Sequence, residues 1–307
     1  MKNPARTVAV ALLGVTLLLT LGNTQAQPTP KTTTKTLTFA VVFQGPRDSV
    51  TEHFRPFADY VARMLEPTGD TNGVVVVAPS AAQMIKLLEE KRVDFYMESP
   101  YPTYIINRLG AARLLLRRWK GGIAEYRSLL FTIKENGMAR LADLRGKIIA
   151  FEDPGSTSGY FLPKLFLLKK GFSLAEKAGR EAKVSPGEIG YIFAGTEKNV
   201  ANLVMQKKVA AGAFSNDDFA HMDDASKASL AMLAETESMP RHLVSVRKDL
   251  PAPVVKRLKE ILVSMHQDKQ GQTILEKADN TTKFDSLPGG EEMVRRKLVE
   301  LYRQRQR

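Results

Sequence analysis

The stretch "FEDPGSTSGYFLPKLFLLKKGF", residues 151–172, carries the pattern that decides the fold. An apolar run ends at Phe151, a turn follows at Pro154 and Gly155, and a mainly apolar helical run then continues to Gly171. Strand, loop and helix in this order form the repeating unit of an α/β sheet, where ligands bind in the loops at the carboxyl ends of the strands. This one stretch therefore predicts both an architecture and the place of a site.

Three hydroxyl side chains crowd the start of the predicted helix: Ser156, Thr157 and Ser158. A helix start exposes unpaired N–H groups and the positive end of the helix dipole, so it suits an anion. Capping the helix needs only one hydroxyl. Capping and anion binding both stay open on these residues alone. Pro163 lies beyond the first turn and predicts a kinked or split helix.

The beginning of the 307-residue chain reads as an export signal. Lys2 and Arg6 precede an apolar run from Val8 to Leu21, and a small-x-small site ends at Ala26. This pattern predicts a signal peptide over 1–26 that is cleaved after Ala26, with an uncleaved membrane anchor as the rival interpretation. The segment 27–36 reads as a linker.

Composition restricts the remaining classes of protein. The absence of cysteine excludes disulfides, thiolate metal sites and a lipid-modified cysteine, so export predicts a soluble periplasmic protein. Loss of the two signal-peptide cations lowers the net charge from +12 to +10, since no acidic residue leaves with them. A basic surface can steer an anionic ligand. Nucleic acid is not predicted as a partner, because no basic run is interleaved with aromatic residues.

The body of the chain alternates apolar runs with helical patterns. Helices are predicted from Phe54 to Leu65, over 81–90 with Ser80 as cap, up to Gly110, after the 151–158 loop, over 196–208, from Asn216 to Glu235, and from 252 onward. Strands are predicted at 36–43, 73–78, 93–97, 113–118, 127–133, 147–151, 190–195, 209–214 and 242–251. This alternation predicts an α/β fold with mostly parallel sheets.

Other loops at strand ends hold further candidate ligand-binding residues. In "MESPYPTY", residues 97–104, Tyr101 and Tyr104 could supply apolar walls and O–H donors or merely pack on the surface. Glu98 in that loop would repel an anion, and Ser99 follows it. In "FSNDDF", residues 214–219, Asn216, Asp217 or Asp218 caps a helix, or Asp217 holds a ligand amine. Gln44, directly after the first strand, is a further candidate.

Enzyme motifs are weak. Ser156 lacks the GxSxG setting of a hydrolase nucleophile, and the carboxylates of Glu152 and Asp153 would point apart. None of the four histidines stands in a metal-binding spacing. A hydrolase that uses Ser156 or Ser158 is therefore the least favoured alternative. No cofactor and no metal are predicted.

Several of these segments resemble one protein family. "DPGSTSGYFLP", residues 153–163, resembles the DP-x-STSG-x-x-x-P signature of PhnD-like proteins, the periplasmic phosphate-, phosphite- and phosphonate-binding components of ABC transporters. "LADLRGKIIAF", "VRKDLP" and "FRPFADYVARML" are similar to its lead-in, returning hinge strand and first-lobe helix. The resemblance implies a type II periplasmic binding-protein fold with two lobes that close on a ligand. It places the first lobe at 37–122 plus 246–307 and the second at 123–245.

The resemblance also implies site residues and partners. The hydroxyls of Ser156, Thr157 and Ser158 match the family residues that hold phosphonate oxygens. Where the family has an anion-binding histidine, this chain offers Glu197 and Lys198, and extra carboxylates appear at Glu98 and Asp217. A zwitterion, with its anionic end on residues 156–158 and its amine near Glu98 or Asp217, would reconcile these features.

The expected role is that of a monomeric, non-enzymatic receptor that brings its small-molecule ligand to an ABC permease. The same fold could instead present its closed form to a sensor kinase or chemoreceptor.

Overall fold

The computed structural model describes residues 35–45, 47–66 and 71–304. The predicted signal peptide, and the predicted linker up to residue 34, lie outside the described residues. Lys35 and Thr36, assigned to the linker from the sequence, already belong to the first strand. Across the described ranges, no helix combines the length and hydrophobicity that a membrane span requires.

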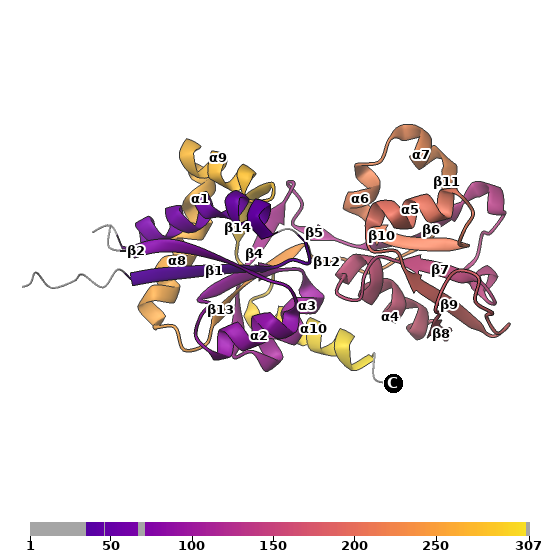
Figure 1. Ribbon diagram of the computed structural model, residues 1–307, viewed down its shortest axis with the longest axis horizontal. Coiled ribbons are helices and arrows are strands. Elements are labelled where there is room, and N and C mark those ends of the chain that lie inside the picture. The colour runs from indigo at the N-terminus through magenta and orange to yellow at the C-terminus, as the bar shows by residue number, and fades with distance from the viewer. Residues whose placement is uncertain (1–34, 46, 67–70, 305–307) are drawn as a thin grey trace, which may run out of the picture. The chain divides into compact units, whose positions relative to one another are not determined.

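Strands and helices alternate along the chain (Figure 1). The strands are β1 Lys35–Val42, β2 Thr71–Ala78, β3 Phe95–Glu98, β4 Ala112–Lys120, β5 Glu125–Tyr126, β6 Ser128–Ile133, β7 Ile148–Phe151, β8 Ser173–Glu176, β9 Glu188–Phe193, β10 Ala211–Ser215, β11 Leu230–Glu235, β12 Met239–Pro240, β13 His242–Arg247 and β14 Thr281–Asp285. The α-helices are α1 Arg47–Leu65, α2 Ala81–Glu89, α3 Pro100–Leu109, α4 Leu162–Lys169, α5 Glu197–Met205, α6 Asn216–Ala220, α7 Asp224–Ser229, α8 Ala252–Ser264, α9 Lys269–Lys277 and α10 Glu291–Gln304.

The first sheet has the strand order β14-β4-β13-β3-β1-β2. β1 pairs in parallel with β2 and β3, whereas β13 is antiparallel to both β3 and β4. Helices α1 and α8 pack on one face over a core of phenylalanines, and α2 and α3 cover the other face (Figure 1). Within that core Phe39 lies 5.1 Å from both Phe57 and Phe95, measured between ring centroids. Burial of each such ring contributes about 1.5–3 kcal/mol.

The second sheet has the order β11-β6-β10-β7-β9-β8. β10, β7, β9 and β8 run parallel, and β6 is antiparallel to both of its neighbours. Helix α5 packs on one face and α4 on the other (Figure 1). Both sheets therefore keep most strands in one direction, as predicted. The two sheets with their helices form the two-lobed α/β architecture that the sequence analysis predicted.

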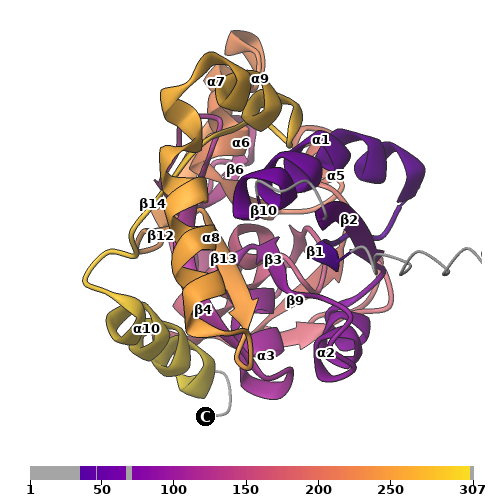
Figure 2. The same cartoon turned by 90° about the vertical axis from the view of Figure 1, so that its left-hand side faces the viewer.

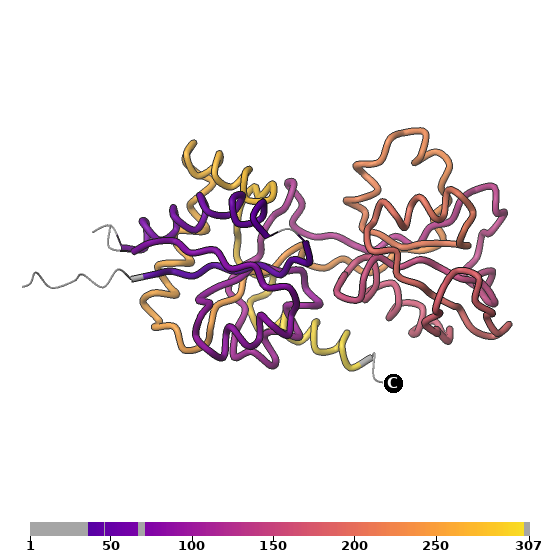
Figure 3. The backbone as a smooth tube through the Cα atoms, viewed as in Figure 1, coloured from indigo at the N-terminus to yellow at the C-terminus, as the bar shows by residue number. Residues whose placement is uncertain are grey.

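Two chain crossings connect the sheets (Figure 3). The first runs from β4 through β5 to β6, and the second returns from β11 through β12 to β13. β5 and β12 pair with each other, with Met239 opposite Tyr126. β13 begins at His242, whereas the sequence analysis placed the return to the first lobe at residue 246. The lobe boundaries themselves stay a prediction.

Several local sequence signals are confirmed, one at α2 and two within the 151–172 stretch. The Ser80 hydroxyl caps α2 by accepting from the amide of Gln83 at 3.2 Å. The helix that contains Pro163 is split as expected into a π-helical turn, Thr157–Phe161, and α4. Gly171 follows α4 with a φ of 80°, a left-handed conformation that glycine adopts without strain.

The predicted helix from Asn216 to Glu235 is wrong beyond its beginning. It divides into the short helices α6 and α7, and its last part is β11. "LAMLAE" consists of good helix formers, but it pairs antiparallel with β6, with Leu230 opposite Ile133. Tertiary pairing here overrides local propensity.

The C-terminal helix α10 lies beside α3 (Figure 2). Its buried Val294 and Leu298 belong to an apolar cluster that spans both lobes. The cluster also contains Tyr101 of α3, Leu114 of β4 and Leu165 of α4. The helical prediction from 252 onward is therefore confirmed for α8, α9 and α10, and one face of α10 is part of a core. It is wrong at Thr281–Asp285, which forms β14, because this segment pairs antiparallel with β4.

Candidate ligand-binding site

A cavity of about 530 Å³ opens where β1 and β3 end. Phe43, directly after β1, and Phe54 of α1 supply apolar walls, and Glu98 stands at the end of β3. Glu152, which follows β7 of the second sheet, lines the same cavity. The carboxyl ends of strands from both sheets thus meet at one site, as the fold class predicts.

Glu98 is held in place by the start of the next helix. Its carboxylate accepts a hydrogen bond from the amide of Ser99 at 2.6 Å. It lines the cavity but is otherwise surrounded by protein, and burial raises its pKa to about 7 against the opposing effect of Ser99, Arg118 and Lys120. Glu98 therefore changes charge near neutral pH.

Glu152 occupies the corresponding place after a strand of the second sheet. Its carboxylate accepts a hydrogen bond from the Ser156 hydroxyl at 2.7 Å. A Cβ at Gly159 would lie 2.4 Å from this carboxylate, so only glycine leaves room for it. Burial raises the pKa of Glu152 to about 7, and the nearby carboxylates of Asp153, Asp218 and Glu197 act in the same direction.

The cations of the site come from β4. The Arg118 side chain is only 2% exposed and donates to the hydroxyl of Thr281 at 2.8 Å and to the Asp279 carboxylate at 3.0 Å. Lys120 Nζ lies 2.8 Å from the same carboxylate. Burial and the neighbouring Arg118 guanidinium hold the pKa of His242 well below its usual range, so this imidazole is neutral at pH 7.

The three hydroxyls of the helix start have different surroundings. Ser156 is the cap, since its Oγ accepts from the amide of Gly159 at 2.9 Å. Thr157 is buried; its Oγ1 accepts from the amide of Tyr101 at 3.0 Å and donates to the Ser99 hydroxyl at 3.1 Å.

Ser158 is buried beside the phenol of Tyr126, and burial raises the pKa of that phenol to about 12. None of the three hydroxyl residues lines the cavity directly, and Ser156 reaches it only through its bond to Glu152.

The aromatic and amide candidates are dispersed. The Tyr101 ring is buried and stacks on Phe161 at 4.0 Å. Tyr104 packs against Tyr302, 4.7 Å between ring centroids, and lines a different cavity. Gln44 is exposed and directly follows Phe43, which lines the site. Of the candidates in 97–104, Glu98 alone lines this cavity; Ser99 bonds the Glu98 carboxylate through its amide, and Tyr104 lies elsewhere.

The acidic candidates of the second sheet lie deeper in the protein. Asp217 is buried with its carboxylate 3.4 Å from the guanidinium of Arg241, so a cation of the protein already faces it. Ser215 and Asp218, rather than Asp217, form the capping pair of α6. Glu197 is half-buried in the first turn of α5 and adds negative charge near Glu152.

Sequence reasoning missed the cations and the acid of the second sheet. Arg118 lies two residues after the buried Leu116 in β4, so the period of two signalled an inward-facing arginine. A buried arginine needs a partner, but nothing local indicates Asp279. Over the described ranges, no group of three or more His, Asp or Glu side chains is arranged to hold a metal ion.

Solved structures with similar folds are binding proteins. The chain is similar to XAC2383 from Xanthomonas citri bound to ATP, at 28% identity and a TM-score of 0.81, covering 89% of this chain and 98% of that one. PhnD1 from Prochlorococcus marinus in complex with methylphosphonate shares the fold, at 17% identity and a TM-score of 0.65, covering 88% and 98% of the two chains.

A curated relative points the same way. The phosphate-import protein PhnD of Mycolicibacterium smegmatis is 28% identical over 159 residues, 50% of this chain and 48% of that protein, so the match spans about half its length. No comparison supports the sensory role or the hydrolase considered above. Residues 39–287 match a family described as the periplasmic substrate-binding protein of phosphonate ABC transporters, which are receptors rather than enzymes. The chain belongs to this family of periplasmic binding proteins.

Proposed function

We propose that this chain binds a small phosphorus oxyanion between its two lobes and delivers it to an ABC importer. The observation that carries the proposal is the family match over 39–287 combined with a cavity at the strand ends that both sheets line. Ser156–Ser158 do not line the cavity in this conformation, so we propose that their N–H groups and hydroxyls reach the ligand's oxygens when the lobes move on closing.

The charges around the cavity favour a ligand that also carries an amine. Glu98 and Glu152 both line it, and Arg118 and Lys120 are already paired with Asp279. A dianion alone would meet two carboxylates once both are ionised, whereas the ammonium of an aminoalkylphosphonate would pair with them. We therefore place the ligand amine at these two carboxylates rather than at Asp217, which faces Arg241.

The remaining parts of the proposal follow from the family role. The mature chain begins after Ala26, acts in the periplasm as a monomer, and meets its permease with the lobes closed around the ligand. Closure requires differential affinity for the closed state, so ligand and permease should recognise the same conformation.

Thermal unfolding of the mature chain against a ligand panel tests the proposal. The panel holds phosphate, phosphite, methylphosphonate, aminoethylphosphonate and, because the Xanthomonas citri relative was solved with it, ATP. A ligand at a hundred times its dissociation constant stabilises the fold by about 2.7 kcal/mol. We expect the largest shift with aminoethylphosphonate, and a smaller one after Glu98→Gln.

Matched variants decide where the ligand lies. Ser158→Ala should weaken every phosphorus ligand, while the exposed Ser173→Ala in β8 should weaken none. Glu98→Gln should weaken only the amine-bearing ligand, with the exposed Glu276→Gln as its control. A panel without any shift would contradict oxyanion binding. An equal response of both phosphonates to Glu98→Gln would contradict the amine site.

A further inference from the structure

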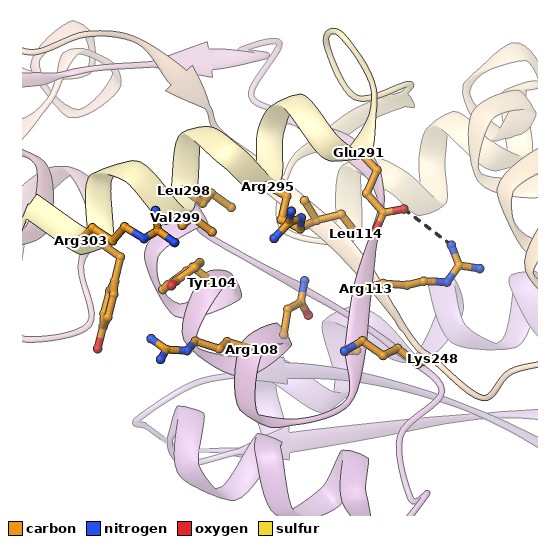
Figure 4. A pocket seen from close by; sticks show the side chains of 13 residues that line it. Tyr104, Arg108, Arg113, Leu114, Lys248, Glu291, Arg295, Leu298, Val299 and Arg303 are labelled. Atoms are coloured by element: carbon orange, nitrogen blue, oxygen red, sulfur yellow. Dashed lines mark ion pairs between the residues drawn. The ribbon is translucent and has the colours of Figure 1, made fainter.

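A second cavity lies between α3, β4 and α10 (Figure 4). Its volume is about 490 Å³, and none of its lining residues is shared with the cavity around Glu98. Tyr104, one of the residues singled out from the sequence, lies here instead. A separate cavity of this size can hold a small molecule or the head of a larger one.

Five cationic side chains line this hollow: Arg108, Arg113, Lys248, Arg295 and Arg303. They come from α3, from β4, from the turn after β13 and from α10, so segments far apart in the sequence converge on one place. Figure 4 shows the two arginines of α10 on one side of the hollow and Arg108 and Lys248 on the opposite side. Glu291 is the single carboxylate among the lining residues.

Much of this positive charge is not neutralised by the described chain. Arg113 lies 3.9 Å from Glu291, a long ion pair, and Arg295 makes two 2.7 Å contacts with the carboxylate of Glu292. Arg108, Lys248 and Arg303 form no ion pair with any residue that the structure describes. Exposed like charges held around a concave surface concentrate the local field and attract anions.

The walls of the hollow are apolar and aromatic. Leu114 and Leu298 are buried behind it, and Tyr104 and Tyr302 lie against each other with 4.7 Å between ring centroids. The Arg108 guanidinium lies 5.6 Å from the centre of the Tyr302 ring. Such a surface suits a ligand with an apolar or aromatic body as well as a charged group.

We propose that this hollow is a second binding site, and that it takes an organic phosphate. The phosphoryl group would pair with Arg108 and Arg303, because the planar guanidinium fork matches phosphate oxygens. The organic part would lie against the tyrosines and leucines. Two sources share this chemistry, a free nucleotide and the headgroup of an anionic phospholipid.

Calorimetric titration with ATP, and sedimentation with phosphatidylcholine vesicles with and without phosphatidylglycerol, test the site. The variant is Arg108→Ala/Arg303→Ala, and the matched control is Arg140→Ala/Arg180→Ala, two exposed arginines of the second lobe. Loss of two charge-assisted contacts should weaken binding at least about tenfold, with the control unchanged. Loss of ATP binding assigns a free nucleotide, and loss of vesicle binding assigns a headgroup.

Two outcomes overturn the proposal. One is equal binding of ATP and vesicles by the variant and the control, which would show that binding does not depend on the two arginines of this cavity. The other is no binding of ATP or anionic vesicles by the unaltered chain. The phosphonate thermal shift, measured on the same variant, separates this proposal from the proposed function: it should be unchanged, because neither arginine lines the cavity around Glu98.

Discussion

Glu98 and Glu152 hold corresponding places in the two lobes, but opposite charges surround them. Glu98 ends β3 and Glu152 directly follows β7. Each accepts a hydrogen bond from a nearby serine, and each has a pKa raised to about 7 by burial. Arg118 and Lys120 pull the pKa of Glu98 down, whereas Asp153, Asp218 and Glu197 push that of Glu152 up.

The comparison shows that desolvation dominates at both places. At Glu98 the hydrogen bonds of Ser99, and after them Arg118 and Lys120, oppose the effect of burial. At Glu152 the hydrogen bond of Ser156 opposes it, and the neighbouring carboxylates add to it. The two carboxyls should therefore respond differently when their neighbours are changed. Substitutions that change the neighbours of one carboxyl should shift its pKa and leave the other unchanged.

The largest effect is expected from Arg118→Met. The variant removes a buried cation that bonds Thr281 and Asp279, and it leaves Asp279 without this partner. Asp279 is 41% exposed and keeps Lys120, so the cost comes from the buried acceptors of Arg118 that lose their donor. Each such acceptor should cost about 1–3 kcal/mol of unfolding free energy, measured by urea denaturation at pH 7. It should also raise the pKa of Glu98 further and leave that of Glu152 unchanged.

Arg140→Met is the control for this variant. The Arg140 side chain is 79% exposed and pairs only with Asp143 three residues away, so its loss should cost about 0.5 kcal/mol or less. Similar losses in the two variants would show that Arg118 does not stabilise the first lobe through its buried contacts.

The second effect is a stability that falls with rising pH. The folded chain holds a proton on Glu98 and Glu152 more tightly than the unfolded chain, whose value is near 4.5. Their contribution is therefore complete below about pH 4.5 and is lost as the pH rises through about 7. The loss should be on the order of 2 kcal/mol per carboxyl.

Glu98→Gln/Glu152→Gln isolates this contribution from the other titrating groups. Glutamine resembles the protonated acid, so the double variant should match the parent chain at pH 4 and exceed its unfolding free energy at pH 8. The exposed Glu276→Gln should show no such crossover. A constant difference between parent and double variant across this range would contradict the raised pKa values.

A third effect concerns the contact between Thr157, at the start of the π-helical turn, and the start of α3. Thr157 of the second lobe accepts from the amide of Tyr101 and donates to the hydroxyl of Ser99 in the first. Thr157→Val keeps the shape and removes both bonds, which should cost about 1–2 kcal/mol in thermal unfolding. Thr273→Val removes one exposed bond within α9 and should cost less. Equal losses of unfolding free energy in Thr157→Val and Thr273→Val would show that the bonds of Thr157 do not hold the two segments together.

Local chemistry made much of the fold predictable. The cap at Ser80, the helix split at Pro163 and the stop at Gly171 each depend on a few neighbouring residues, and all are found. The strand at Leu230–Glu235 was not predictable in this way, because its pairing with β6 depends on a segment about one hundred residues earlier.

The sequence predicted the location of the site, at the ends of strands, but not most of the residues that line it. It also predicted that Glu152 and Asp153 point apart. They do: the Asp153 carboxylate accepts from the amide of Gly155 at 2.7 Å within the turn, and Glu152 lines the cavity. Residues 151–153 alone do not indicate which of the two carboxylates shares a cavity with Glu98, because that depends on how the sheets are joined.

The smallest effect tests why Glu152 and Glu98 differ. Ser156→Ala removes a helix cap, which costs about 1 kcal/mol, and it also removes the hydroxyl that donates to Glu152. Thr196→Ala removes only a cap, the acceptor for the amide of Asn199 at the start of α5. Because the lost donor favours the ionised carboxylate, the pKa of Glu152 should rise after Ser156→Ala. The loss of unfolding free energy should then grow from pH 5 to pH 9 in this variant and stay constant in Thr196→Ala. Parallel pH profiles for the two variants would mean that Ser156 acts as a cap alone, and that the surrounding carboxylates, not this serine, set the charge of the second lobe's acid.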